Sequence, residues 1–282
     1  MHDLHIIQID PIITRALEED WGFGDWTTDI CVPADKLSHA TIIAKETALI
    51  AGVDIAAAVF RRVDPSLTIQ AAVKNGQLVQ KGDVLLEISG CARSILKAER
   101  VALNFFARMC GIATMTRAFV DQLEGTKAQL LDTRKTTPGL RILEKSATVI
   151  GGARNHRFSL CDGVIVKENH IRASGGIKPA VSRLLESLPP TLKVEVEVSN
   201  LEEVQEALDA GAHVLMLDNM SLSEMTMAVR TVRGRALIEA SGNVRLENVR
   251  RVAETGVDFI STSAVFHSSR WVDLSLLFSL EP

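Results

Sequence analysis

The chain of 282 residues lacks closely spaced cysteine pairs, a long apolar run and an N-terminal pattern typical of a signal peptide. Its four cysteines form no CxxC pair, which predicts reduced thiols and a cytoplasmic protein. Its longest apolar run, Ala48–Phe60, contains Asp54 and is too short to span a bilayer. No positively charged segment precedes an apolar stretch at the N-terminus, so we expect no signal peptide and a soluble protein.

A strong net charge is also missing. The chain has 31 Lys and Arg against 35 Asp and Glu, a formal charge of -4, whereas proteins that coat nucleic acids are usually strongly basic. We therefore expect neither a nucleic acid nor a membrane as partner. The hydrophobic share of 46% is ordinary for a globular protein and excludes disorder. No GxSxG nucleophile motif is present, which argues against acyl transfer and hydrolysis.

Up to about Leu123, strand-like segments alternate with helices. A helical pattern runs from Ile95 to Leu123, and Gly111 is the expected position of a kink. Strands are expected at 41–44, 49–51, 67–73 and 84–88, and a shorter helix at 54–62.

From Ala128 onward the pattern is strand, loop and helix, repeated. The strands are continuous apolar runs, as expected when both faces of a parallel sheet are buried. Six such units favour a βα barrel over an open doubly wound sheet, although spacing alone leaves the second fold open. The expected strands are 129–132, 163–167, 192–198, 213–218, 236–240 and 257–262.

Polar residues stand at the ends of five of these strands, and Glu195 and Glu197 lie within the third. In a βα barrel the active site lies at the carboxyl ends of the strands, so these residues are the candidates for chemistry. They are Asp132–Lys135, Lys167–His170, Glu195 with Glu197, Asp218 with Asn219, Ser241–Asn243 and Thr262–Ala264.

Positive charge is concentrated in one segment. Between Arg134 and Lys167 there are seven Lys or Arg and two acids, inside a chain that is negative overall. Arg134, Lys135, Arg157 and Lys167 stand at element ends, where they can converge on carboxylates or phosphates. His156 is a weaker candidate for binding an anion, since a lone histidine is more often structural.

Small residues end the last two strands. Ser241–Asn243 and Thr262–Ala264 would let backbone N–H groups approach a phosphate, which barrels often bind after their final strands. Small residues at these positions are also common as turn formers.

Two carboxylates fall on adjacent expected strands, Glu197 and Asp218. Carboxylates inside an apolar barrel are costly unless they bind a cation or hydroxyl groups, and near phosphates Mg²⁺ is the natural partner. A salt bridge to one of the basic residues is the alternative. Glu195 lies two residues before Glu197 and so faces the same side of its strand, toward the barrel interior.

Eight segments resemble one family, the quinolinate phosphoribosyltransferases. The resemblance runs from Glu19 to about Leu276, and DTRKTTPG followed by NHR about twenty residues later is its most specific part. The segments are EDWGFGDWTTD, ERVALNFFARMCGIAT, LDTRKTTPGLRILEKSA, NHRFSLCDGVIVKENHI, VEVEVSNLEE, HVLMLDNM, IEASGNV and TGVDFISTSAVFHS.

The resemblance implies an N-terminal open α/β sandwich and an incomplete C-terminal α/β barrel. Their expected extents are 1–123, including a long linking helix, and 124–266, with 267–282 returning to the N-terminal domain. It also implies a homodimer and a reaction. Quinolinate and phosphoribosyl pyrophosphate would give nicotinate mononucleotide, pyrophosphate and CO₂, with Mg²⁺, in NAD biosynthesis.

The resemblance also implies roles for individual residues. Arg100 would reach the site of the neighbouring subunit to help bind quinolinate. Glu197 and Asp218 would hold the ribose hydroxyls and Mg²⁺, and Lys135 would meet the pyrophosphate together with Lys167. The quinolinate carboxylates would be surrounded by Arg134, His156, Arg157 and Lys167. The strand-end groups Thr133, Ser241, Gly242, Asn243, Thr262, Ser263 and Ala264 complete the expected substrate site, with the last six cradling the 5-phosphate.

The chain departs from the family at the expected phosphate cradle. Asn243 and Ser263 stand where the family usually has glycine, so a side chain there either adds a hydrogen bond or crowds the phosphate. Two other functions remain open at this point. One is a phosphoribosyltransferase for another aromatic acid, and the other is a non-catalytic barrel that binds a phosphorylated ligand.

Overall fold

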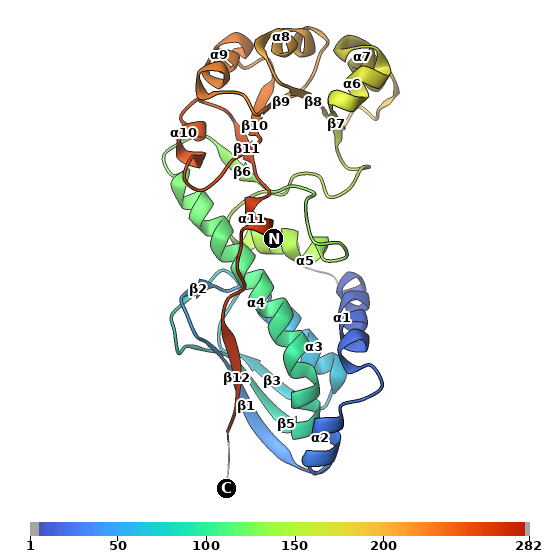
Figure 1. Cartoon of the computed structure of the whole chain (residues 1–282), viewed down its shortest axis with the longest axis vertical. Helices are drawn as coiled ribbons and strands as arrows, with labels where there is room; N and C mark the ends of the chain where they lie inside the picture. Colours follow the sequence, from blue (N-terminus) through green and yellow to red (C-terminus); the bar gives the residue numbers. More distant parts are fainter. Residues whose placement is uncertain (1–5, 280–282) are drawn as a thin grey trace. The chain divides into compact units, whose positions relative to one another are not determined.

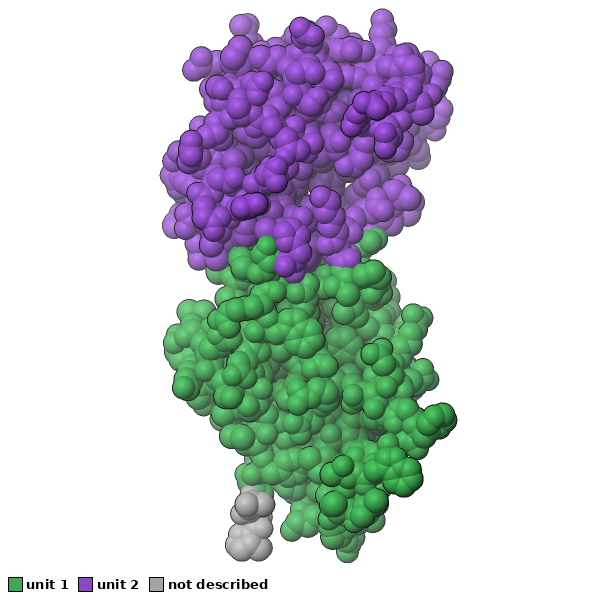
Figure 2. Space-filling model, viewed as in Figure 1, with its two compact units in different colours: residues 1–117, 137–151, 268–282 green, residues 118–136, 152–267 purple. Residues whose placement is uncertain are grey.

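A computed structural model describes residues 6–279 of the chain. The chain forms two compact units, coloured green and purple in Figure 2. Unit 1 comprises residues 1–117, 137–151 and 268–282, and unit 2 comprises 118–136 and 152–267. The expected domain extents 1–123, 124–266 and 267–282 stay a prediction, and residues 1–5 and 280–282 lie outside the described residues.

Unit 1 contains an antiparallel sheet with the strand order β12-β1-β5-β3. Strand β1 (Leu37–Ala44) lies between β12 (Leu274–Ser279) and β5 (Val84–Cys91), and β3 (Thr68–Ala71) pairs with β5. The alternating burial of β1 gives the sheet one buried face. A separate pair joins β2 (Ala48–Leu49) to β4 (Leu78–Val79).

Helices accompany this sheet (Figure 1), and the longest of them is unbroken. Helix α4 (Ala92–Gln122) runs through Gly111 without interruption, so the expected kink is replaced by a packing role for the glycine. A Cβ at Gly111 would lie 2.0 Å from the carbonyl oxygen of Arg270, so only glycine leaves room for the segment between α11 and β12. The other helices of unit 1 are α1 (Ile6–Trp21), α2 (Trp26–Cys31), α3 (Val53–Val63) and α5 (Arg141–Ile150).

Unit 2 is built on a six-stranded parallel sheet with the order β6-β11-β10-β9-β8-β7. The end strands β6 and β7 are not paired with each other, so the barrel is incomplete, as expected. The strands are β6 (Gln129–Leu131), β7 (Val164–Val166), β8 (Val194–Val198), β9 (Val214–Asp218), β10 (Leu237–Ser241) and β11 (Phe259–Ser261).

Helices alternate with these strands along the chain, as Figure 1 shows. Helix α8 begins with the side chain of Asn200 accepting the N–H of Glu203, and α9 begins with a capping box of Ser221 and Glu224. The helices of unit 2 are α6 (Glu168–Ser174), α7 (Ile177–Ser187), α8 (Leu201–Asp209), α9 (Leu222–Val232), α10 (Val249–Ala253) and α11 (Ala264–His267).

The six strands expected in the second half of the chain are all present, each within about two residues of its expected limits. The fold class is therefore confirmed. Helix α1 and strand β12 were not predicted from the sequence. Within residues 6–279 no helix combines the length and the apolar character needed to cross a membrane.

Candidate active site

A cavity of about 520 Å³ opens at the carboxyl ends of the strands of unit 2. That volume lies in the range of small-molecule sites. Eleven of the fifteen expected substrate-binding residues line it, together with Asn219, which the sequence placed among the strand-end candidates, and with Ile165, Met216 and Ser261, which were not predicted. The expected residues in the lining are Thr133, Arg134, Lys135, His156, Arg157, Lys167, Glu197, Asp218, Ser241, Gly242 and Asn243.

Four cations reach this cavity from separate parts of unit 2. Arg134 and Lys135 follow β6, Arg157 lies on the segment between β6 and β7, and Lys167 follows β7. Burial and the nearby guanidinium of Arg134 lower the pKa of Arg157, so two like charges are held close together. Nη1 of Arg157 donates to the carbonyl of Gly163 at 2.8 Å. Such a cluster is suited to a ligand that carries more than one carboxylate or phosphate.

Two carboxylates line the same cavity, Glu197 at the end of β8 and Asp218 at the end of β9. Lys167 Nζ lies 2.6 Å from Glu197 Oε2, so the salt bridge considered as the alternative is present. Asp218 Oδ2 accepts a hydrogen bond from Asn219 Nδ2 at 2.8 Å. Carboxylate oxygens on neighbouring strands are also the donor type that Mg²⁺ prefers, so this pair fits the ion.

The turn after β10 is shaped by close backbone approach. Gly242 has φ +88, and a Cβ there would lie 2.3 Å from Oδ1 of Asn219 and 2.8 Å from its backbone nitrogen. Asn243 and Asn219 have φ 52 and 55, a left-handed conformation that asparagine tolerates well. Asn243 Nδ2 donates to Asn219 Oδ1 at 2.9 Å. The side chain at position 243 therefore makes an additional hydrogen bond between the turn after β10 and the turn after β9.

The segment after β11 lies outside the lining of this cavity, as does Arg100. Thr262 Oγ1 donates to the carbonyl of Val244 at 2.9 Å and accepts the N–H of Ala264 at 3.1 Å. Ser263 Oγ lies 3.1 Å from His267 Nε2. These contacts hold the start of α11 in place. Arg100 lies on the exposed side of α4 in unit 1.

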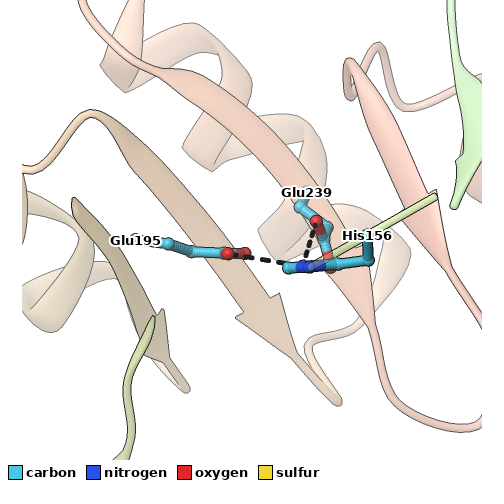
Figure 3. Close-up of side chains that lie close together, drawn as sticks. All are labelled: His156, Glu195 and Glu239. Atoms are coloured by element: carbon cyan, nitrogen blue, oxygen red, sulfur yellow. Dashed lines mark ion pairs between the residues drawn. The ribbon is translucent and has the colours of Figure 1, made fainter. Parts of the chain in front are cut away.

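His156 lies between two buried carboxylates (Figure 3). Its Nε2 is 3.3 Å from Glu195 Oε2 and 3.4 Å from Glu239 Oε2. Burial lowers the pKa of His156, but the hydrogen bonds to the two glutamates outweigh it and raise the pKa to about 10. That shift would need a second hydrogen on Nδ1, but Nδ1 accepts the N–H of Arg157 at 2.7 Å, so the geometry holds the ring in its neutral form with its one hydrogen on Nε2. Burial raises the pKa of Glu195.

Glu239 was missed in the sequence, although a signal for it exists. It is the acid within the buried run LIEAS of β10 and is 1% exposed. A carboxylate inside an apolar strand is costly and needs a partner. This holds for Glu239 as it does for Glu197 and Asp218. Glu195 was expected to face the barrel interior, and the structure places it there, opposite His156.

An incomplete parallel barrel with a cavity of clustered cations and two carboxylates defines an enzyme class that acts on small, multiply anionic substrates. Comparison with protein families identifies the family within this enzyme class. Residues 112–277 match the family model of the quinolinate phosphoribosyl transferase C-terminal domain, and residues 25–110 match that of its N-terminal domain. The chain belongs to the quinolinate phosphoribosyltransferase family.

Individual relatives agree with this assignment. A probable nicotinate-nucleotide pyrophosphorylase [carboxylating] from Synechocystis is 47% identical over 273 residues, which is 96% of this chain and 92% of the relative. The chloroplastic enzyme of that name from Arabidopsis thaliana is 44% identical over 96% of this chain and 82% of its own length. The crystal structure of NadC from Streptococcus pyogenes matches with a TM-score of 0.94 and 38% identity, covering 99% of this chain and all of the other.

Proposed function

We propose that this chain transfers the phosphoribosyl group of phosphoribosyl pyrophosphate to quinolinate and releases CO₂, a step of NAD biosynthesis. The family assignment supports this reaction, and one observation on the chain itself carries it. The parallel sheet brings Arg134, Lys135, Arg157 and Lys167 together in a single cavity of about 520 Å³, beside two carboxylates. This cavity offers both the cations that a pyridine dicarboxylate needs and the acceptors that a ribose needs.

In this proposal the two arginines and Lys167 bind the carboxylates of quinolinate. Arg134 and Arg157 supply forked donors that match a carboxylate, and Lys167 supplies a compact charge. Together they orient the ring nitrogen toward the anomeric carbon of the ribose. The free energy of binding thereby holds the two reacting atoms in the geometry that the reaction needs. Lys135, an exposed residue of the cavity lining, meets the pyrophosphate together with Lys167.

Glu197 and Asp218 accept hydrogen bonds from the ribose hydroxyls, and Ser241–Asn243 cradle the 5-phosphate. Thr262–Ala264 would contribute to the cradle through the start of α11. Glu197 and Asp218 are also the residues that would hold Mg²⁺. When bound, the ion supplies positive charge that neutralises the departing pyrophosphate.

The bonds exchanged are few. The quinolinate nitrogen forms a bond to the anomeric carbon while the bond from that carbon to the pyrophosphate oxygen breaks, and pyrophosphate leaves with the electron pair. The positive ring nitrogen then stabilises the electron pair left at the neighbouring carbon when CO₂ departs, and that carbon takes a proton from solvent. The protein's contribution is placement of charge rather than an acid–base group of its own.

We propose a homodimer in which Arg100 of each subunit completes the quinolinate site of the other. We also propose a cytoplasmic location, supported by four free cysteines, of which Cys31 and Cys161 are exposed. Exposed free thiols persist in a reducing compartment.

Mixing the purified chain with phosphoribosyl pyrophosphate, Mg²⁺ and quinolinate labelled at the carboxyl next to the ring nitrogen tests the reaction. We expect equal amounts of nicotinate mononucleotide, pyrophosphate and labelled CO₂, and loss of turnover when the ion is chelated. Turnover of another aromatic acid without CO₂ would indicate the related transferase instead. Binding of phosphoribosyl pyrophosphate without turnover of any acid would indicate a non-catalytic barrel.

A further inference from the structure

The feature that the reaction does not account for is the cluster of His156, Glu195 and Glu239 (Figure 3). The side chains of Glu195 and Glu239 are 8% and 2% exposed, and they come from β8 and β10, on either side of β9. Both place Oε2 against the same ring nitrogen of His156. Burying two carboxylates beside one histidine is costly, so the arrangement calls for an explanation.

Both ring nitrogens of His156 are occupied by protein atoms. Nδ1 accepts the backbone N–H of Arg157 at 2.7 Å, which leaves the ring hydrogen on Nε2. Nε2 in turn lies 3.3 Å and 3.4 Å from the two glutamates. A ring held in this way offers no nitrogen lone pair to a ligand.

The backbone around the ring is held as well. The N–H of His156 donates to Oδ1 of Asp132, a fully buried residue directly after β6, at 2.8 Å. The neighbouring Arg154 pairs with β6 through its N–H and its carbonyl. The segment that carries Arg157 is thus tied to β6 by its backbone and to β8 and β10 by the His156 ring.

A metal site is the alternative use of such a cluster, and the hydrogen bonds argue against it. A histidine that ligates a metal through one nitrogen normally donates a hydrogen bond from the other. Here Nδ1 accepts a hydrogen bond, so Nε2 carries the hydrogen and has no lone pair to give. Oε1 of each glutamate is buried with no hydrogen-bond partner among the described residues. Buried oxygens without a hydrogen-bond partner are tolerated where the function of a site outweighs the free-energy cost of burying them.

We propose that Glu195 and Glu239 are positioning residues, which lock the His156 ring so that it sets the direction of Arg157 and does not itself hydrogen-bond the substrate. This inference rests on the proposed function, because the group being positioned is a proposed ligand of quinolinate. It assigns His156 a different role from the direct contact implied by the family resemblance.

The first test measures kinetics in variants of Glu239. Glu239→Ala should raise the KM for quinolinate about tenfold, the size expected for loss of a charge-assisted hydrogen bond, while the KM for phosphoribosyl pyrophosphate changes little. Glu239→Gln keeps an acceptor of the same shape and should restore most of the affinity. Asp258→Asn is the matched control, since Asp258 accepts the N–H of Ile238 at the opposite end of β10. An equal rise in both KM values in Glu239→Ala would overturn the proposal.

The second test uses the unaltered enzyme, so it does not depend on the folding of a variant. Nitrogen-15 NMR of the histidine rings, with His156 identified by its loss in His156→Asn, reports which ring nitrogen carries hydrogen. We expect Nε2–H in the free enzyme and unchanged ring shifts when quinolinate is added to saturation. A shift of either nitrogen by quinolinate would make His156 a direct ligand and refute the positioning role.

These results separate the two proposals. If quinolinate is not turned over, the proposed function fails, and the ring hydrogen in the free enzyme still tests the geometry. If an acid other than quinolinate is turned over, that acid takes the place of quinolinate in the titration. A ring hydrogen found on Nδ1 would contradict the positioning role whatever the substrate is.

Discussion

Single side chains determine which of the two proposed substrates each part of the cavity binds. Arg134 and Lys135 are adjacent in the sequence, yet we assign them to different substrates, the first to quinolinate and the second to pyrophosphate. The reason is burial. Arg134 is half-buried next to Arg157, whereas Lys135 is exposed, and a forked guanidinium suits a bound carboxylate better than a mobile ammonium does.

Replacing Arg134 separates these two roles. Arg134→Ala should raise the KM for quinolinate by about tenfold to a hundredfold and the KM for phosphoribosyl pyrophosphate much less, because only one substrate loses a charge-assisted contact. Steady-state kinetics with each substrate varied in turn checks this. Lys135→Ala is the matched variant and should show the opposite preference. Equal weakening of both substrates in Arg134→Ala would contradict the assignment.

At the scale of elements, the turns after β9 and β10 act together. Asn243 donates to Asn219, and Asn219 donates to Asp218, so a row of hydrogen bonds runs from the expected phosphate cradle to a residue expected to hold the ribose. The Asn219 N–H also donates to the carbonyl of Ser241. Gly242 leaves the space that the Asn219 side chain occupies.

Asn243→Gly interrupts this row without backbone strain, since glycine accepts the left-handed conformation. We expect the KM for phosphoribosyl pyrophosphate to rise about twofold to tenfold, the effect of one partly exposed hydrogen bond, and the KM for quinolinate to change little. Arg233→Gly is the control. Arg233 is also left-handed, with φ 50, but it ends α9 outside the cavity lining. A lower KM in Asn243→Gly would mean that the asparagine crowds the phosphate instead.

At the scale of the whole molecule, the proposed homodimer determines where Arg100 acts. Arg100 lies in unit 1, and the cavity is lined by residues of unit 2 alone. The proposed dimer supplies Arg100 from the partner subunit. Such an arrangement has a distinctive consequence, because two different inactive subunits can then form one complete site.

Mixing Arg100→Ala with Lys135→Ala checks that consequence. A dimer of one subunit of each kind has one site with both residues intact, so random exchange of subunits should restore up to about a quarter of the wild-type activity. Activity assays after mixing, with sizing of the assembly by light scattering, measure it. Recovery requires the residue to act in the partner's site. If Arg100 acted within its own subunit, every site in the mixture would lack a residue and no activity would return.

The sequence by itself was sufficient to predict a site for carboxylates or phosphates and the positions where the parallel strands end. Buried parallel strands are continuous apolar runs, so each strand of unit 2 was visible locally, and the cations after β6 and β7 could be placed from strand order alone. Family motifs then specified the reaction. The roles of the individual site residues remain predictions, although eleven of the fifteen meet in one cavity.

The tertiary structure alone decided which distant residues meet. Strand β12 pairs with β1 from the other end of the chain; the resemblance implied that 267–282 returns to the N-terminal domain, but no local pattern specifies which strand it pairs with. The contact of His156 with both Glu195 and Glu239 depends on the register of β8, β9 and β10, which is set by packing across the whole sheet. The sequence shows which charged residues the chain contains. Only the folded sheet determines which of them are buried against each other and which face the substrate.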